Sequence, residues 1–123
     1  MKVAIVGLGF VGNALFRAIK DDVCIYKVDP KLGTAIEDLV DFKPNIIFIT
    51  VPTPMHDNGD QDTSILEKVL DQINKLNINS LVVIKSTVLP NIFVRLLHWG
   101  FVILSPKYPP CWKHRCLAFT MNP

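Results

Sequence analysis

Three glycines spaced Gly7-x-Gly9-x-x-Gly12, together with the acid Asp29, are residues whose types and positions point to chemistry. A glycine after a strand allows a sharp turn, a second lets the backbone approach a phosphate, and a third lets a helix pack closely. Free N–H groups at the start of that helix attract a pyrophosphate. A carboxylate 22 residues after Gly7 is placed to accept hydrogen bonds from a ribose. The pattern therefore predicts a dinucleotide site.

The glycine spacing alone is common, so its meaning depends on the elements around it. Residues 2–6 form an apolar run typical of a buried strand, and residues 23–28 form a second run that ends at Asp29. Between the two runs, apolar residues recur at helical spacing: Phe10, Val11, Ala14, Leu15, Ala18 and Ile19. This strand–turn–helix–strand order favours dinucleotide binding over a tight turn that binds nothing.

The acid also bears on the choice of cofactor. Asp29 favours NAD over NADP, because a carboxylate repels the 2′-phosphate of NADP. Lys31 lies two residues later and weakens this preference, because its charge offsets part of the repulsion. The backbone N–H groups of Phe10 and Val11, at the start of the predicted helix, are expected to face the pyrophosphate. NAD is therefore the predicted cofactor.

Length and composition indicate an ordinary small domain. The chain has 123 residues, of which half are hydrophobic and a fifth charged, and this length allows a real core. A net charge of +2 does not point to nucleic acid or to an anionic membrane. No apolar run approaches the about 18 residues of a membrane span, and glycines interrupt the first run of what could be a signal peptide. Three cysteines make no disulfide framework, so a cytoplasmic protein is expected, and homo-oligomerisation is left open.

Predicted strands and helices alternate along the chain. The alternation predicts an α/β fold, a Rossmann-like doubly wound parallel sheet with the strand order 3-2-1-4-5 in chain numbering. The carboxyl ends of its strands would then lie along one edge of the sheet, where ligands bind. The predicted strands are 2–6, 23–28, 45–51, 81–84 and 101–104, and the predicted helices are 10–19, 33–40, 65–76 and 90–98, with Asp62 or Thr63 capping the third.

The composition changes after residue 104. Residues 105–123 hold four prolines, three Lys or Arg and no acid, without helical or strand periodicity. We therefore expect a dinucleotide-binding domain over 1–104 and a poorly structured, basic, proline-rich tail over 105–123. Cys111, His114 and Cys116 in this tail do not have the spacing of a common zinc module, so no metal is predicted.

The motifs at the predicted strand ends together resemble the NAD-binding domain of the UDP-glucose/GDP-mannose dehydrogenase family. The matching segments are 2–12, Val28-Asp29, Val51-Pro52-Thr53-Pro54, Asp62 and Ile84-Lys85-Ser86-Thr87-Val88, within residues 1–106. The family oxidises the C6 hydroxymethyl group of a nucleotide sugar to a carboxylate with two NAD. The resemblance implies that Phe10 and Val11 meet the pyrophosphate and that Asp29 meets the adenosine ribose.

The resemblance also implies roles at the later strand ends. Thr53, which follows Pro52, and Thr87 would lie along the nicotinamide half of NAD. The family's threonine in Lys-Ser-Thr is linked to the water of its hydrolysis step, which makes Thr87 the candidate catalytic residue. A hydroxyl suits this place, because it both donates and accepts hydrogen bonds. Two alternatives stay open from the residues alone: Thr87 as a helix cap, and Lys85 as a solvated charge instead of a phosphate contact.

Two departures from the family pattern bear on activity. Lys107 stands where the family has a catalytic glutamate, and lysine is protonated at neutral pH and so a poor replacement for a carboxylate base. The family's nucleophile motif, Cys-Phe-Pro-Lys-Asp, does not occur in this sequence. These departures predict a truncated or frame-disrupted member that is inactive alone, with a nucleotide sugar as partner only in a full-length relative. The alternatives are a non-enzymatic nucleotide-binding or interaction module and another β-hydroxyacid-type dehydrogenase.

Overall fold

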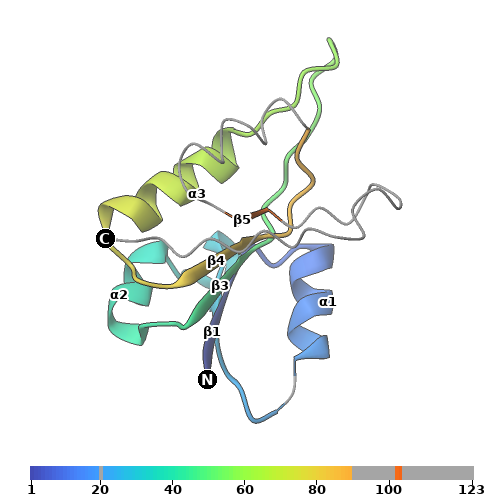
Figure 1. The fold of residues 1–123 in the computed structure, drawn as a ribbon. Coiled ribbons are helices and arrows are strands. Elements are labelled where there is room, and N and C mark those ends of the chain that lie inside the picture. Colours follow the sequence, from blue (N-terminus) through green and yellow to red (C-terminus); the bar gives the residue numbers. More distant parts are fainter. Residues whose placement is uncertain (20, 90–101, 104–123) are drawn as a thin grey trace.

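The computed structural model describes residues 1–19, 21–89 and 102–103. Within these residues five parallel strands form one sheet (Figure 1), which confirms the predicted parallel α/β architecture. The strands are β1 (Lys2–Val6), β2 (Cys24–Val28), β3 (Ile46–Ile49), β4 (Leu81–Ile84) and β5 (Val102–Ile103). The predicted helix 90–98 and the tail 105–123 lie outside the described residues.

The strand order is β2-β1-β3-β4-β5, so the predicted order 3-2-1-4-5 is wrong in the place of the third strand. β3 pairs with β1 instead of lying outside β2. Burial gives the physical reason. β2 has an exposed residue, Cys24, and half-buried Lys27, and these suit the edge of a sheet.

The helices cover the two faces of the sheet unequally. α1 (Phe10–Ala18) lies on one face, and α2 (Leu39–Phe42) and α3 (Ser64–Lys75) lie on the other (Figure 1). The helix predicted at 33–40 is not continuous; two 3₁₀ turns, η1 (Pro30–Leu32) and η2 (Ile36–Asp38), precede α2. Gly33 ends η1 in the left-handed conformation, with φ 68°. None of the helices in the described segments has the length and apolar character needed to cross a membrane.

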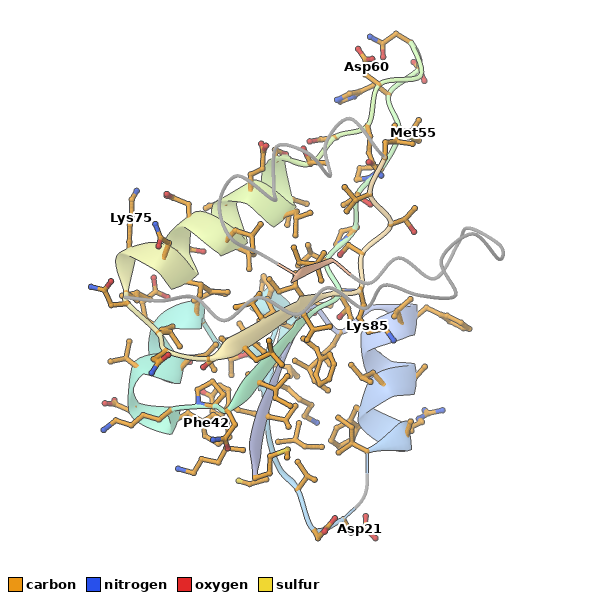
Figure 2. All side chains as sticks on the ribbon, in the orientation of Figure 1. Asp21, Phe42, Met55, Asp60, Lys75 and Lys85 are labelled. Carbon is orange, nitrogen blue, oxygen red and sulfur yellow. The ribbon has the colours of Figure 1, made fainter. Side chains whose placement is uncertain are left out.

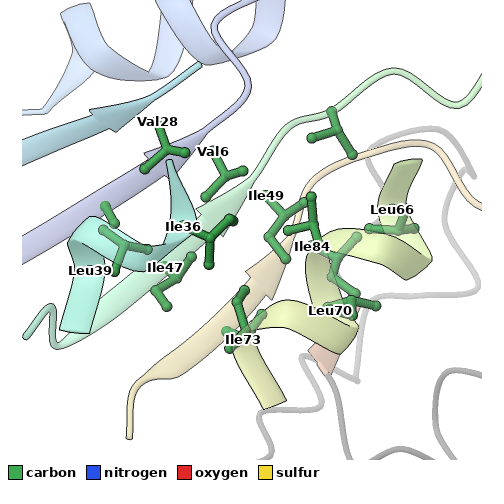
Figure 3. Packing of buried hydrophobic residues seen from close by; sticks show 14 of the residues in the cluster. Val6, Val28, Ile36, Leu39, Ile47, Ile49, Leu66, Leu70, Ile73 and Ile84 are labelled. Atoms are coloured by element: carbon green, nitrogen blue, oxygen red, sulfur yellow. The ribbon is translucent and has the colours of Figure 1, made fainter. Parts of the chain in front are cut away.

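The main core lies between the sheet and the helices α2 and α3 that cover one of its faces (Figure 3). Leu66, Leu70 and Ile73 of α3 are fully buried at helical spacing, as predicted, and pack with Ile49 and Ile84 of the sheet. Burying side chains of this size contributes about 1.5–3 kcal/mol each. This packing fixes β3, β4 and α3 to one another, and thereby fixes the segments that follow β3 and β4.

The side of the sheet facing α1 is packed differently. Gly12 is buried, whereas Phe10 is 94% exposed and Val11 47% exposed. α1 therefore contacts the sheet at its first turn through a glycine, and the two apolar residues beside that glycine face outward. The predicted helix is confirmed, but most of its apolar residues are not part of the core.

Candidate functional site

The two central strands define where a ligand can enter. β1 continues into α1 on one face of the sheet, and β3 leads into α3 on the other face (Figure 1). Loops that leave adjacent parallel strands in opposite directions open a crevice between them, which is where open α/β sheets bind ligands. A pocket of about 900 Å³ lies at this point. Its volume is within the range of about 300–1,000 Å³ typical of small-molecule sites.

The structure brings the predicted binding residues together around this pocket. All of them except Gly12 line it, although they come from four separate segments of the chain. Those that line it are Gly7, Gly9, Phe10, Val11, Asp29, Lys31, Pro52, Thr53 and Thr87. Lys85 lines it as well, whereas His56 is exposed and does not. We call residues 7–12 and 28–34 the β1–β2 end of the pocket, and residues 50–54, 61 and 85–89 its β3–β4 end.

The three glycines of the loop meet different spatial demands. Gly7 has a φ of 91°, and a Cβ there would lie 3.0 Å from the backbone nitrogen of Val51. At Gly12 a Cβ would collide with the carbonyl oxygen of Gly7, so α1 can start this close to β1 only with glycine. A Cβ at Gly9 would have no atom of the described residues within 4 Å. Gly7 and Gly12 therefore shape the turn, and Gly9 leaves space on the pocket side.

Asp29 joins the end of β2 to the glycine loop. Its Oδ2 accepts a hydrogen bond of 2.7 Å from the N–H of Leu8, and its Oδ1 accepts one of 2.9 Å from the N–H of Lys31. These two bonds, that from Leu8 first, lower the pKa of the carboxyl group below its ordinary value. Each oxygen of an ionised carboxylate has capacity for a further hydrogen bond. Asp29 is only 9% exposed, and its exposed part lines the pocket.

Thr34 supports this arrangement and was not predicted. Its Oγ1 accepts from the N–H of Asp29 at 2.9 Å and donates to the carbonyl of Lys27 at 2.8 Å. The hydroxyl thus bonds to backbone groups at the outer edge of β2, where a further strand would otherwise pair. No sequence pattern singles out this threonine, because it lies in a turn whose path depends on the fold.

Two further side chains hold the glycine loop from the sheet and from the helix. The buried hydroxyl of Thr50 lies within hydrogen-bond distance of the Gly7 carbonyl, to which it can donate. The carboxamide of Asn13 donates to the carbonyls of Leu8 at 2.9 Å and Gly9 at 3.1 Å. A polar residue directly after a run of buried apolar ones is a signal that could have identified Thr50.

Side-chain hydrogen bonds connect the segments at the β3–β4 end. Thr53 donates from Oγ1 to the carbonyl of Thr87 at 2.7 Å. Gln61 donates from Nε2 to the same carbonyl at 2.8 Å, and its Oε1 accepts from the N–H of Leu89 at 3.0 Å. Sequence reasoning did not find Gln61, which reaches this place because residues 55–61 fold back as a hairpin closed by a Met55–Gln61 bridge.

A buried serine adds a second connection between these segments. Ser86 is 6% exposed and donates from Oγ to the carbonyl of Val51 at 2.7 Å. It thereby joins the residues that directly precede Pro52 and Thr87, both of which line the pocket. Figure 2 shows Lys85 beside this edge, and Met55 and Asp60 on the hairpin that extends away from the sheet.

Of the two residues predicted to cap α3, Asp62 makes side-chain hydrogen bonds to the first residue of the helix and Thr63 does not. Asp62 accepts from the N–H of Ser64 at 3.0 Å and from its hydroxyl at 2.6 Å, whereas Thr63 makes no side-chain capping bond. The bonds from Ser64 lower the pKa of Asp62 below its ordinary value. Across residues 1–19, 21–89 and 102–103, no cluster of three or more His, Cys, Asp or Glu could hold a metal ion.

The parallel sheet, the glycine turn at its crevice and the acid at the end of β2 define a Rossmann-like α/β domain of the dinucleotide-binding class. The sequence model of the UDP-glucose/GDP-mannose dehydrogenase family, NAD binding domain, matches residues 31–99, more than half of the 123 residues. The chain belongs to this family, and the resemblance that the motifs indicated is confirmed. No curated protein sequence gave a match.

Solved structures agree on the fold. A UDP-D-ManNAc dehydrogenase from Pyrococcus horikoshii is 23% identical, with a TM-score of 0.61 over 91% of this chain. A UDP-glucose dehydrogenase from Pyrobaculum islandicum is 21% identical, with a TM-score of 0.60 over 85%. A GDP-mannose dehydrogenase from Pseudomonas aeruginosa is 22% identical, with a TM-score of 0.55 over 85%. The present chain spans 38%, 35% and 35% of these proteins, respectively.

Proposed function

We propose that the pocket binds NAD and that the chain is the NAD-binding domain of a nucleotide-sugar 6-dehydrogenase of the UDP-glucose/GDP-mannose type. The observation that carries the proposal is the 2.7 Å hydrogen bond from the Leu8 N–H to Asp29. This bond joins Asp29 to the glycine loop, and both line the same pocket. The same carboxylate lines the pocket and has hydrogen-bonding capacity beyond its two bonds to the loop, so it can also accept from a ribose hydroxyl.

The residues present fit the parts of NAD in order along the pocket. Asp29 would accept from the adenosine ribose, and Lys31 lies beside it. The backbone N–H groups of Phe10 and Val11 would face the pyrophosphate, in the open space next to Gly9. This space supports the fit, because the pyrophosphate approaches the backbone where no side chain intervenes.

The other half of NAD would lie toward Pro52, Thr53 and Thr87 at the β3–β4 end. When bound, NAD accepts a hydride from the carbon that carries the hydroxyl group of the substrate. The contribution of this chain is to hold the cofactor so that one face of its nicotinamide ring is open to a substrate. We propose Thr87 as the residue nearest to that chemistry, with its hydroxyl able to bind a water molecule.

Gly9→Val tests the cofactor site with little risk to the fold. Gly9 has a φ of −78°, and within the part of the chain that the structure describes a Cβ there meets no atom within 4 Å. We expect wild-type protein to bind NAD in calorimetry and Gly9→Val to show no measurable binding while its circular dichroism spectrum is unchanged. The control is Ala14→Val, which adds bulk to an exposed position of the same helix and should bind normally. Equal NAD affinities of wild type and Gly9→Val would reject the site.

A second candidate function is a nucleotide-binding module without catalysis. It is favoured by Lys107, which stands where the family has a catalytic glutamate. Oxidation of an alcohol to an acid needs a base and a nucleophile, and each such group typically supplies about 10²-fold or more. We therefore expect purified chain with NAD and UDP-glucose or GDP-mannose to produce no NADH by absorbance. Steady NADH production free of host enzyme would favour a complete dehydrogenase.

A further inference from the structure

Gln61 occupies a position between the two segments of the β3–β4 end. Its Nε2 donates to the Thr87 carbonyl at 2.8 Å and lies 3.4 Å from the Thr53 carbonyl. Its Oε1 accepts from the Leu89 N–H at 3.0 Å. Both ends of one carboxamide are therefore bonded to backbone groups, and the half-buried side chain crosses from the segment after β3 to the segment after β4. A side chain held in this way fixes the distance between the two segments.

The same network sets the hydrogen-bonding character of Thr53. A threonine hydroxyl has one hydrogen and two acceptor lone pairs. That hydrogen is donated to the Thr87 carbonyl at 2.7 Å. Thr53 therefore offers the pocket, which it lines, an acceptor. The group of the ligand that meets it is a hydrogen-bond donor.

The position of the β3–β4 end relative to Asp29 identifies which part of the ligand it meets, and this step rests on the proposed function. Along the sheet the order is β2, β1, β3, β4, with neighbouring parallel strands about 4.8 Å apart. If the adenosine ribose meets Asp29 after β2 and the pyrophosphate meets the loop after β1, the second half of the dinucleotide reaches the ends of β3 and β4.

We propose that Gln61 is a positioning residue for the nicotinamide half of the cofactor. It acts through the backbone of Thr87 and Leu89 to hold Thr53 and Thr87 where they line the pocket. Gln61 does not line the pocket, so its effect on a ligand is exerted through these neighbours. The consequence is selective: binding of the nicotinamide half depends on Gln61, whereas binding of the adenosine half does not.

Two substitutions separate the effect of the donor group of the Gln61 side chain from that of its acceptor group. Gln61→Glu is nearly isosteric and retains an acceptor for the Leu89 N–H, but its ionised form loses the donor to the Thr87 carbonyl. Gln61→Leu loses both. Asn74→Leu is the matched control, because it replaces another carboxamide at an exposed position of α3 away from the pocket. Calorimetry with NAD, ADP-ribose and ADP reports on the whole cofactor, the cofactor without its nicotinamide ring, and the adenosine half.

We expect wild type to bind NAD more tightly than ADP, and both Gln61 variants to lose about three- to tenfold of that preference while their ADP affinity is unchanged. Asn74→Leu should retain the preference. If the loss appears between NAD and ADP-ribose, the donor that meets Thr53 is on the nicotinamide ring; if it appears between ADP-ribose and ADP, the donor is on the second ribose. Either result supports the role of Gln61.

Other results overturn the inference. An unchanged preference for NAD in Gln61→Glu, or an equal loss of NAD and ADP affinity, would show that Gln61 has no selective effect on this half. If Gln61→Leu does not fold by circular dichroism, the isosteric glutamate variant decides alone. Wild type that binds neither ligand rejects the proposed function and this inference with it, whereas wild type that binds both without a Gln61 effect rejects the inference only.

A double variant tests whether Gln61 acts through Thr53. Thr53→Val removes the hydroxyl at nearly constant volume. If Gln61 acts by holding Thr53, the loss of NAD preference in the Gln61→Glu, Thr53→Val double variant is smaller than the sum of the two single losses. Additive losses would mean that the two residues act independently and would contradict the positioning role.

Discussion

The two ends of the pocket are held by different kinds of interaction. At the β1–β2 end, backbone geometry dominates: Gly7 has a positive φ, Gly12 leaves no room for a Cβ, and Asp29 binds two backbone N–H groups. At the β3–β4 end, side chains of ordinary conformation, Gln61 and Ser86 among them, donate to backbone carbonyls. Steric exclusion allows one residue type, whereas a single hydrogen bond contributes about 0.5–1.5 kcal/mol. Substitutions of Gly7 and Gly12 should therefore have all-or-none effects, whereas substitutions of single hydrogen-bonding side chains should have graded effects.

Gly12→Ala should have the largest effect. The added Cβ would collide with the carbonyl oxygen of Gly7 and would lie 2.8 Å from Oγ1 of Thr50. Because the first neighbour is backbone, no rotamer change relieves the contact, and overpacking of this kind costs about 3 kcal/mol or more. Urea denaturation should show this loss of unfolding free energy, together with loss of NAD binding.

Gly9→Ala is the matched control for this substitution. Gly9 lies in the same loop, and among residues 1–19, 21–89 and 102–103 the added Cβ would meet no atom within 4 Å. We expect its unfolding free energy to stay within about 0.5 kcal/mol of wild type, as for most surface substitutions. Equal stability of Gly9→Ala and Gly12→Ala would mean that the β1–β2 end is not held by close backbone packing.

Asp29→Asn should have an intermediate effect on binding. The uncharged amide loses a hydrogen bond between a charged acceptor and the ribose, worth about 1.5–3 kcal/mol. We expect NAD affinity to fall by about ten- to hundredfold. The difference between NAD and NADP should also narrow, because the carboxylate no longer repels a 2′-phosphate. Calorimetry with both cofactors measures this, and an unchanged NAD affinity would remove Asp29 from the ribose site.

The pH dependence of stability separates the loop role of Asp29 from its ligand role. The N–H groups of Leu8 and Lys31 lower the pKa of Asp29 in the folded state. A lowered carboxyl pKa stabilises the fold above the unfolded-state pKa of about 3.9, and this contribution disappears as the pH falls through the folded-state pKa. Without ligand, wild type should therefore lose stability below about pH 4 more steeply than Asp29→Asn. Parallel pH profiles would indicate that the two hydrogen bonds do not stabilise the loop.

The same contrast explains what the sequence could and could not predict. The glycine loop and Asp29 follow from local spacing, because the turn, the helix start and the next strand lie within the first thirty residues. The place of β3 depends instead on whether it pairs with the free edge of β1 or with that of β2. The apolar content of the strands alone did not decide between these two edges. The charged Lys27 within the predicted second strand was the available sign in the sequence that β2 is an edge.

The side chains that position the site were harder to predict for a related reason. Gln61 lies in a polar loop where its type carries no periodic signal, and it reaches Thr87 only after residues 55–61 fold back as a hairpin. Thr34 acquires its role from its two hydrogen bonds to the backbone of Lys27 and Asp29, at the end of β2. Both roles depend on contacts between distant segments, which neither spacing nor composition records. Pro52, Thr53 and Thr87 were found only because their strand-end motifs resemble those of the family.

Ser86→Ala should have the smallest effect, and a second buried serine makes the test sharp. Ser86 and Ser80 are each 6% exposed, and each donates from Oγ to a carbonyl on the segment flanking β3, that of Val51 and that of Pro44, respectively. The two serines lie beyond opposite ends of β4, and Ser86 lines the pocket. Either alanine variant loses one buried hydrogen bond, so both should lower the unfolding free energy by about 1 kcal/mol.

Their effects on binding should differ although their effects on stability agree. Loss of the Ser86 bond frees the segment that presents Thr53 and Thr87, and we expect NAD affinity to fall by about two- to fivefold, within the range of one hydrogen bond. Ser80→Ala should leave NAD affinity unchanged, because the bond it removes is at the far end of β4 from the pocket. Calorimetry and urea denaturation on the same three proteins give both quantities. An equal loss of NAD affinity in both variants would mean that general destabilisation, and not the hydrogen bonds at the β3–β4 end, controls binding of the nicotinamide half.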